Sequence, residues 1–266
     1  PCVACNQGVK FTDLLGMARD LGCEAMATGH YVRRVEGPSG AEMHRPVDAE
    51  RDQTWFLFAT TKDQLDYLRF PLGEMPDKAH VRELAQELGL EIAAKPDSQD
   101  ICFVPSGSYV DIVEKLRPEI WGEGEIVDEQ GNVLGHHEGV ARYTVGQSKR
   151  LGDIHTAVGE RQMVTRIDVP KRRIVVGPRV QATEVETRKT IRLRDMNWLM
   201  DAPPEGVSCG VQIRAREKLR EAVVKPLANG EALVELTEPA MPAPGQACVL
   251  YDGSRVLGGG FILAGA

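Results

Sequence analysis

The chain of 266 residues lacks an apolar run near the roughly 18 residues of a membrane-spanning helix, and its start lacks a basic-then-apolar signal segment. Cysteines are few: six in a chain of this length are too sparse for a disulfide scaffold. A hydrophobic content of 42% is ample for packed cores. We therefore expect a globular, cytoplasmic protein without a membrane partner.

Positive charge is in deficit overall, with a net charge of -7, but it is unevenly distributed. Residues 142–225 contain 18 Lys and Arg against 10 Asp and Glu, so this stretch carries +8 and the remainder -15. Local positive charge is what phosphate binding uses. The stretch is a candidate for holding nucleic acid, although such charge runs also occur on solvated faces of β-hairpins.

Helix and strand patterns alternate in the first part of the chain. Apolar residues at helical spacing predict helices over 10–21, 62–68 and 77–88. A short buried strand over 23–31 and a hairpin over 31–47 follow the first of these. Such alternation predicts an α/β layer with a parallel sheet. Too few strands are present to complete the sheet, and the chain begins with Pro rather than Met, so we expect an N-terminal portion of the natural protein to be absent.

The rest of the chain has short β-branched runs separated by Gly, Pro, Asp and Asn. Its last segment has a Pro-Gly turn, a strand, an Asp-Gly hairpin turn and a final strand, as in a small β-barrel. We therefore predict a partial α/β domain over 1–107, a central β-rich domain over 108–182 and a C-terminal barrel over 183–266.

Cys2 and Cys5 form a C-x-x-C motif, which is typical of half a zinc site, of a redox pair, or of one working thiol with an incidental neighbour. No second cysteine pair and no regular histidine spacing accompany the motif, so we expect no metal site. A redox pair would open a helix, and Asn6 is a candidate N-cap for a helix that begins near Gly8. The other two interpretations stay open.

Cys102 lies in the polar turn "KPDSQDICFVP", although most free cysteines are buried as small apolar residues. The Asp and Ser residues of this turn can fix a loop and expose the residues after it. Spacing alone still favours a buried structural thiol for both Cys5 and Cys102.

Seven segments in order carry a stronger signal: "PCVACNQGVKF", "ATGHYVRR", "RDQTWFLF", "FPLGEMPDKAHVRELAQELGL", "KPDSQDICFV", "GEIVDEQGNVLGHHEGVARYTVGQSKRLG" and "PGQACVLYDGSRVLGGGFI". Together they resemble the tRNA-specific 2-thiouridylase family over essentially the whole chain. Members of that family begin with a Ser-Gly-Gly-type loop that binds ATP, and this sequence lacks it. The resemblance therefore implies a partial PP-loop domain of the adenine-nucleotide alpha-hydrolase type, followed by two β-rich domains.

The resemblance implies thiolation of the wobble uridine in tRNAs for Lys, Glu and Gln. The cofactors would be ATP, with Mg2+, and a persulfide from a sulfur relay protein or a cysteine desulfurase. Because a carbonyl oxygen is a poor leaving group, ATP first adenylates O2 of the uridine, and sulfur then attacks C2 as AMP departs.

Two thiols have roles in this chemistry. Cys102 resembles the residue that receives the persulfide, and Cys5 resembles its partner thiol. Attack of Cys5 on the inner sulfur would leave a disulfide between the two cysteines, which requires Cα atoms roughly 4.4 to 6.8 Å apart. Cys5 could instead attack the adenylated base directly, and the sequence does not decide between these routes.

The resemblance also implies functional roles for several individual residues. Gly29 resembles an ATP contact, where a glycine leaves room for close backbone approach. The positions that resemble tRNA or target-base contacts are Pro1, Cys2, His30, Arg51, Asp52, Gln53, Arg214, Ala215 and Gln246.

Three of these positions depart from the family pattern. Arg51 replaces Lys, which keeps the charge but changes the geometry. Ala215 replaces Tyr, so ring stacking on RNA from that position is lost. Asp is frequent where Cys2 stands, which leaves the role of Cys2 open. The target base must leave the anticodon-loop stack to reach buried cysteines, so we also expect base flipping.

Two other classes of function remain. A non-catalytic RNA-binding module with structural cysteines could not show ATP-dependent thiolation. A pyrophosphatase-type transferase that acts on a small molecule would not bind tRNA with a steep salt dependence.

Overall fold

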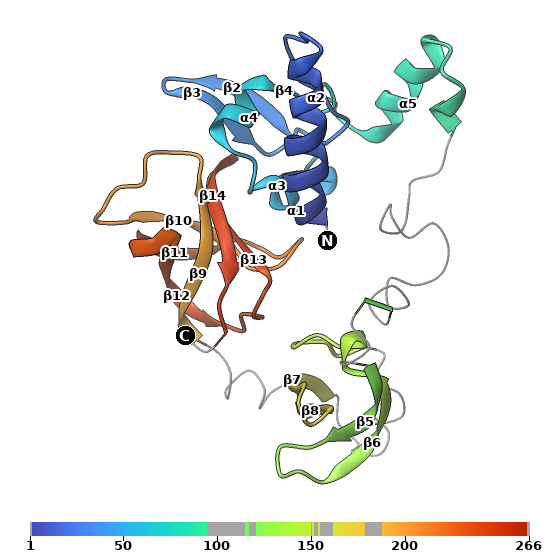
Figure 1. Ribbon diagram of the computed structural model, residues 1–266, viewed down its shortest axis with the longest axis vertical. Helices are drawn as coiled ribbons and strands as arrows, with labels where there is room; N and C mark the ends of the chain where they lie inside the picture. Colours follow the sequence, from blue (N-terminus) through green and yellow to red (C-terminus); the bar gives the residue numbers. More distant parts are fainter. Residues whose placement is uncertain are drawn as a thin grey trace. The chain divides into compact units, whose positions relative to one another are not determined.

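The computed structural model describes residues 2–94, 115–116, 121–149, 151, 154, 162–178 and 188–264. Pro1, Cys102 with its turn, and the predicted boundaries at 107 and 182 lie outside the described residues. The chain forms two compact units (Figure 1), one of residues 1–97, 189–238 and 244–266, and one of residues 98–188 and 239–243.

The helices in chain order are α1 (Cys2–Cys5), η1 (Asn6–Leu14), α2 (Leu15–Asp20), η2 (Ala49–Arg51), α3 (Thr54–Leu57), α4 (Lys62–Tyr67), α5 (Lys78–Glu87), η3 (Glu91–Ala94), η5 (Val140–Arg142) and η6 (Ala228–Gly230). The strands are β1 (Met26–Ala27), β2 (Arg33–Gly37), β3 (Gly40–His44), β4 (Leu68–Arg69), β5 (Trp121–Val127), β6 (Val133–Gly139), β7 (Gln162–Asp168), β8 (Arg173–Pro178), β9 (Arg188–Trp198), β10 (Val207–Gln212), β11 (Arg220–Pro226), β12 (Ala232–Ala240), β13 (Ala247–Asp252) and β14 (Arg255–Ile262). None of the described helices is long and apolar enough to cross a membrane.

The first helix is a continuous run of α1, η1 and α2 (Figure 1). The predicted helix is confirmed, and Gly22 follows it with a φ of 75°, a left-handed conformation that glycine adopts without strain. The predicted N-cap is wrong, because the helix begins at Cys2 and Asn6 lies inside it. The middle of the run is a π-helix, a rare geometry that is frequent at functional sites.

The helices predicted over 62–68 and 77–88 are confirmed as α4 and α5, whereas the strand predicted over 23–31 is only the two residues of β1 and is not buried. β1 and β4 form a two-stranded parallel sheet, and β2 and β3 form the predicted antiparallel hairpin. Asp77 caps α5 by accepting a hydrogen bond from the His80 backbone N–H at 2.8 Å. α4 begins with a capping box, in which Thr61 and Gln64 each accept a hydrogen bond from the other's backbone N–H.

The C-terminal region forms a closed barrel, as predicted. Its strand order is β13-β10-β11-β12-β9-β14, and β13 pairs with β14 to close it. β3 extends the same sheet by pairing with β14 at His44 and Arg255. A single apolar core also joins the two regions, since Phe11 and Phe58 of the first region pack in one cluster with Val249 and Tyr251 of the barrel.

The second unit is built on a four-stranded sheet in the order β6-β5-β8-β7. β5 and β8 run parallel, and the other two pairs are antiparallel. Ile126, Val164 and Ile174 lie at the centre of its apolar core. This unit therefore has its own core, separate from that of the first unit.

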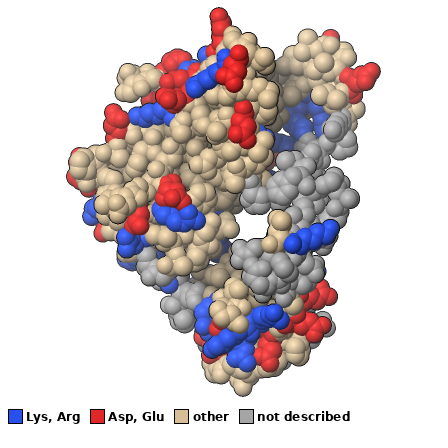
Figure 2. Space-filling model, viewed as in Figure 1, with Lys and Arg blue, Asp and Glu red and all other residues tan. Residues whose placement is uncertain are grey.

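Acidic residues from elsewhere offset part of the basic stretch over 142–225. Arg173 pairs with Glu125 at 2.7 Å and Lys225 with Glu235 at 2.7 Å. Both glutamates lie outside the stretch in sequence. The parallel pair β5–β8 brings Glu125 beside Arg173, and the antiparallel pair β11–β12 brings Glu235 near Lys225. Figure 2 shows Lys and Arg close beside Asp and Glu over the second unit, rather than an unbroken basic surface.

Candidate functional site

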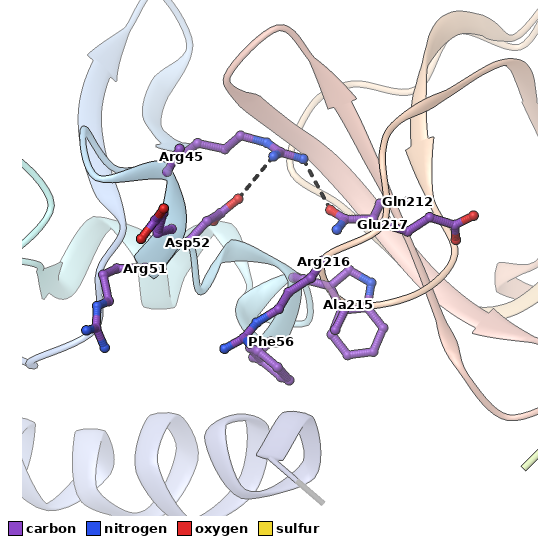
Figure 3. A pocket seen from close by; sticks show the side chains of 11 residues that line it. Arg45, Arg51, Asp52, Phe56, Gln212, Ala215, Arg216 and Glu217 are labelled. Carbon is purple, nitrogen blue, oxygen red and sulfur yellow. Dashed lines mark hydrogen bonds and ion pairs between the residues drawn. The ribbon is translucent and has the colours of Figure 1, made fainter. Parts of the chain in front are cut away.

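A pocket of about 590 Å³ lies within the first unit, between the segment that follows β3 and the loop that follows β10 (Figure 3). Arg51 and Asp52 line one wall, and Ala215 lines the other. All three residues are predicted tRNA contacts, and Ala215 lies more than 160 residues after Arg51 and Asp52 in the chain. The fold therefore brings two of the predicted segments to one cavity.

Asp52 is fully engaged within the chain. Its Oδ1 accepts hydrogen bonds from the Thr54 backbone N–H at 2.9 Å and from the Thr54 hydroxyl at 2.6 Å. Its Oδ2 lies 3.2 Å from Arg45 Nη1 in a partly buried ion pair. Both carboxylate oxygens thus stabilise the conformation of the pocket wall, and the Asp52 side chain is partly buried rather than an exposed group.

Arg45 joins this wall to the barrel (Figure 3). Its Nη2 donates to Gln212 Oε1 at 3.2 Å, and its guanidinium lies 4.0 Å from the centre of the Tyr251 ring. The Tyr251 hydroxyl lies 3.1 Å from Thr54 Oγ1, and since the Thr54 proton goes to Asp52, Tyr251 is the donor. Burial raises the pKa of Tyr251, which keeps this phenol protonated.

Gln53 connects the pocket wall to the segment that carries Gly29 and His30. Its side-chain Oε1 accepts from the Tyr31 backbone N–H at 2.8 Å, and its own N–H donates to the Tyr31 carbonyl at 3.3 Å. Among the described residues other than its chain neighbours, the atom that a Cβ placed on Gly29 would meet is Leu72 Cδ1, at 3.9 Å. These residues therefore leave room beside Gly29 for the predicted approach of a ligand.

His30 is a neutral, largely buried imidazole. Its Nδ1 lies 2.9 Å from the Thr28 hydroxyl, and its ring packs edge-on against Phe11 with centroids 5.9 Å apart. Burial, together with the positive charge of Lys10, lowers the pKa of His30 from 6.5 to about 4. At neutral pH His30 offers a hydrogen bond rather than a positive charge.

Cys2 and Cys5 are free thiols in the first turn of the long helix. Cys2 is exposed and Cys5 half-buried, and their spacing of three residues places them on one helix face. Because Cys5 is a free thiol and Cys102 lies outside the described residues, the structure does not support a resting disulfide between them.

The helix that carries Cys5 packs directly against the pocket wall. Asn6, the next residue, is 4% exposed and donates from Nδ2 to the Phe56 carbonyl at 3.3 Å. Phe56 and Trp55 belong to α3 and line the pocket. The candidate catalytic thiol and the pocket are thus linked through a single hydrogen bond and the contacts around it.

The remaining predicted contacts lie at one end of the barrel. β10 and β13 are antiparallel with Gln212 opposite Val249, so Arg214 lies at the same end as Gln246. Gln246 is exposed, and its carbonyl accepts from the Ile262 N–H at 2.8 Å. The loop with Arg214 and Ala215 and the turn with Gln246 therefore form a common rim.

Eight of the residues that line the pocket were not predicted from the sequence: Trp55, Phe56, Arg45, Ala49, Glu50, Gln212, Arg216 and Glu217. Two adjacent aromatic residues after "RDQ" were the only available signal for the first pair. No sequence pattern marks Glu217, whose position depends on the loop conformation, including a φ of 64° at Arg216. Among the residues that the structure describes, no cluster of three or more His, Cys, Asp or Glu is placed to hold a metal ion.

Comparison with known proteins agrees with this arrangement. Residues 1–106 match the family described as tRNA methyl transferase HUP domain, residues 111–178 the tRNA methyl transferase PRC-barrel domain, and residues 188–262 the aminomethyltransferase beta-barrel domain. The tRNA-specific 2-thiouridylase MnmA of Gluconobacter oxydans (strain 621H) is 90% identical over 100% of this chain and 73% of its own length. This chain belongs to the tRNA-specific 2-thiouridylase family.

Other members of the 2-thiouridylase family are similar along the same span. The enzyme named tRNA-specific 2-thiouridylase MnmA is 59% identical in Acidiphilium cryptum, over 99% of this chain and 72% of the relative. In Ruegeria pomeroyi it is 52% identical, over 100% of this chain and 71% of the relative. The predicted fold class, an α/β nucleotide-binding type domain followed by two β-rich domains, is thereby confirmed.

Proposed function

We propose that this chain catalyses 2-thiolation of the wobble uridine of tRNA, with ATP as the activating cofactor and a persulfide as the sulfur source. The observation that carries the proposal is the contact between two parts of the site. The helix with Cys5 packs through Asn6 onto α3, and α3 lines the pocket that Arg51, Asp52 and Ala215 share. Family membership supports the same reaction.

The proposed chemistry has two stages. O2 of the uridine attacks the α-phosphate of ATP and releases pyrophosphate, with Mg2+ expected to accompany the nucleotide. The terminal sulfur of a Cys102 persulfide then attacks C2, and AMP departs with the former O2. Cys5 attacks the inner sulfur, so the product leaves as 2-thiouridine and a Cys5–Cys102 disulfide remains for reduction by a thiol. Direct attack of Cys5 on the base is the alternative route.

Several residues have proposed binding roles in this scheme. Gly29 would contact ATP, since the space beside it is open. The proposed tRNA contacts are Pro1, Cys2, His30, Arg51, Asp52, Gln53, Arg214, Ala215 and Gln246. Arg51 and the rim of the barrel would act directly, whereas Asp52 and Gln53 would position their neighbours through their hydrogen bonds within the chain.

The partners and domain roles follow from the same scheme. We propose the tRNAs for Lys, Glu and Gln as substrates and a persulfide-carrying relay protein or a cysteine desulfurase as the donor. The adenylating domain would end near residue 107 and the central domain near residue 182.

The experiment compares cysteine variants of the full natural protein. Cys5→Ser and Cys102→Ser should each reduce thiolation of tRNA by about 100-fold or more, because a nucleophile or sulfur carrier is removed. Cys23→Ser is the matched control, since Cys23 is an exposed free thiol outside the site. Peptide mass spectrometry after incubation with a persulfide donor should find added sulfur on the Cys102 peptide in Cys5→Ser but not in Cys102→Ser. Full thiolation by both variants would refute the two-thiol scheme.

A further inference from the structure

Lys10 lies on the helix that carries Cys5, and its charge is not neutralised by a neighbour. Its side chain is half-buried, whereas most lysines are exposed. Within the part of the chain that the structure describes, the Lys10 ammonium forms no ion pair with a carboxylate and no hydrogen bond. The ammonium can therefore bind an anion without giving up an existing ion pair.

The π-helix sets the position of Lys10 relative to Cys5. Backbone hydrogen bonds of a π-helix join residues five apart, and η1 begins directly after Cys5, so Lys10 follows Cys5 by one turn. Contacts on either side hold this turn in place. Asn6 donates to a carbonyl of α3 at 3.3 Å, and the Phe11 carbonyl accepts from Gln64 Nε2 at 2.8 Å. The charge of Lys10 is thus carried on a fixed turn next to the candidate thiol.

Lys10 also lies near the segment with Gly29 and His30. Phe11, the next residue of the helix, packs edge-on against the His30 ring with centroids 5.9 Å apart. The Lys10 charge is near enough to His30 to lower its pKa further, after burial as the larger cause. The helix with Cys5 and the segment with Gly29 therefore meet where Lys10 supplies positive charge.

The type of anion follows from the residues around Lys10. Proteins hold phosphate groups with N–H donors and with Lys or Arg. The described residues leave room for a ligand beside Gly29. His30 is neutral at pH 7, because its pKa is about 4, so it can donate a hydrogen bond but brings no positive charge. A phosphate group at this segment would take its positive charge from Lys10.

We propose that Lys10 binds a phosphate group at the Gly29–His30 segment, one helical turn from Cys5. The inference rests on the proposed function, because both of its substrates, ATP and tRNA, carry phosphate. Gly29 is the expected ATP contact and His30 an expected tRNA contact, so the phosphate has two sources that the experiment has to separate. From either source, a charge-assisted hydrogen bond from Lys10 Nζ would fix the substrate next to Cys5.

The first arm of the test measures nucleotide binding to the full natural protein. Isothermal titration calorimetry compares α,β-methylene-ATP with adenosine, which has no phosphate. If Lys10 binds a phosphate of ATP, Lys10→Gln should weaken binding of the ATP analogue roughly 10-fold to 100-fold and leave adenosine unchanged. Lys10→Arg keeps the charge and should stay within about 5-fold of wild type. An equal loss for the analogue and for adenosine would overturn the phosphate contact.

The second arm measures RNA binding without ATP. Fluorescence anisotropy gives the affinity for a labelled anticodon stem-loop at several salt concentrations. If Lys10 binds a tRNA phosphate, Lys10→Gln should weaken this binding, and the dependence of its logarithm on the logarithm of salt concentration should become shallower by about 1. Binding of the ATP analogue should then be unchanged. A response in both arms would mean that Lys10 contacts phosphates of both substrates.

A matched lysine controls for the loss of charge. Lys62→Gln removes an exposed lysine of α4 whose partner Asp201 is fully solvated, and it should leave both arms unchanged. The unfolding midpoint of each variant shows whether it is folded. Since Lys10 has no partner among the described residues, Lys10→Gln should unfold at the same midpoint as wild type.

The outcomes separate the two proposals. If the wild-type protein binds both ligands and thiolates tRNA but Lys10→Gln changes neither arm, the Lys10 inference is wrong and the proposed function stands. If the wild-type protein binds neither ligand and thiolates no tRNA, both are wrong.

Discussion

Site residues from the α/β region and from the barrel loop differ in how they are used. Asp52, Gln53 and His30 are committed to hydrogen bonds or ion pairs inside the chain. Ala215 and Gln246 of the barrel are exposed. The resemblance to the family implies tRNA contacts for both groups, whereas their environments favour a positioning role for the first group and direct contact for the second. Substitutions in the first group should act on stability, and those in the second on binding.

The largest effect is expected at Asp52. Asp52→Ala removes two hydrogen bonds and leaves the Arg45 guanidinium without its carboxylate, so the free energy of unfolding should fall by about 3 kcal/mol. Denaturant unfolding measures this change. Asp201→Ala is the matched control, because its ion pair with Lys62 has a fully solvated carboxylate and should contribute less than about 0.5 kcal/mol. Equal losses in the two variants would remove the distinction between the regions.

His30 should make stability depend on pH. The pKa of His30 is about 4 in the folded chain against 6.5 for an ordinary histidine, so the unfolded chain binds the proton more tightly. The His30 contribution is therefore complete above pH 6.5 and is lost as the pH falls toward 4, by about 2 kcal/mol between pH 7 and pH 5.

Unfolding curves of wild type and His30→Gln at these two pH values isolate this contribution. The loss on acidification should be smaller in His30→Gln by that amount, whereas His80→Gln, at an exposed position, should behave as wild type. An identical pH response in all three proteins would contradict the buried neutral state of His30.

Tyr251 should show an intermediate effect. Tyr251→Phe keeps the ring under Arg45 but removes the hydroxyl that donates to Thr54, so the free energy of unfolding should decrease by about 1 kcal/mol. Thermal or denaturant unfolding measures it. Asp52→Ala combined with Tyr251→Phe should cost less than the sum of the two single changes, because both act through Thr54. Strict additivity would mean that the two contacts are independent.

The smallest effect on stability is expected at Arg216. Arg216 has a φ of 64°, which glycine adopts without strain, so Arg216→Gly should change the free energy of unfolding by no more than about 0.5 kcal/mol. Binding of tRNA should instead weaken, and its dependence on the logarithm of salt concentration should become shallower by about 1. If the variant is stable and the salt dependence of its tRNA binding is unchanged, Arg216 does not contact the RNA.

Local signals in the sequence predicted most of the elements. Helix periodicity and the Asp-Gly hairpin depend on neighbours within one or two turns of chain, and each is confirmed. The predicted N-cap at Asn6 is wrong because a tertiary contact decides the environment of this residue. Asn6 is buried against α3 inside a longer helix, and a polar residue near a helix start is no evidence of a cap when a partner elsewhere holds it.

The sequence by itself determined the family and the α/β and β-rich character of its parts, and it predicted Arg51, Asp52 and Ala215 as tRNA contacts. Tertiary structure decided that these residues line one pocket, because β3 adds to the barrel sheet and Arg45 bridges Asp52 to Gln212. It also decided that Trp55 and Glu217 belong to the site and that His30 is neutral. Burial and long-range hydrogen bonds cause these outcomes, and neither can be read from residues that are neighbours only in sequence.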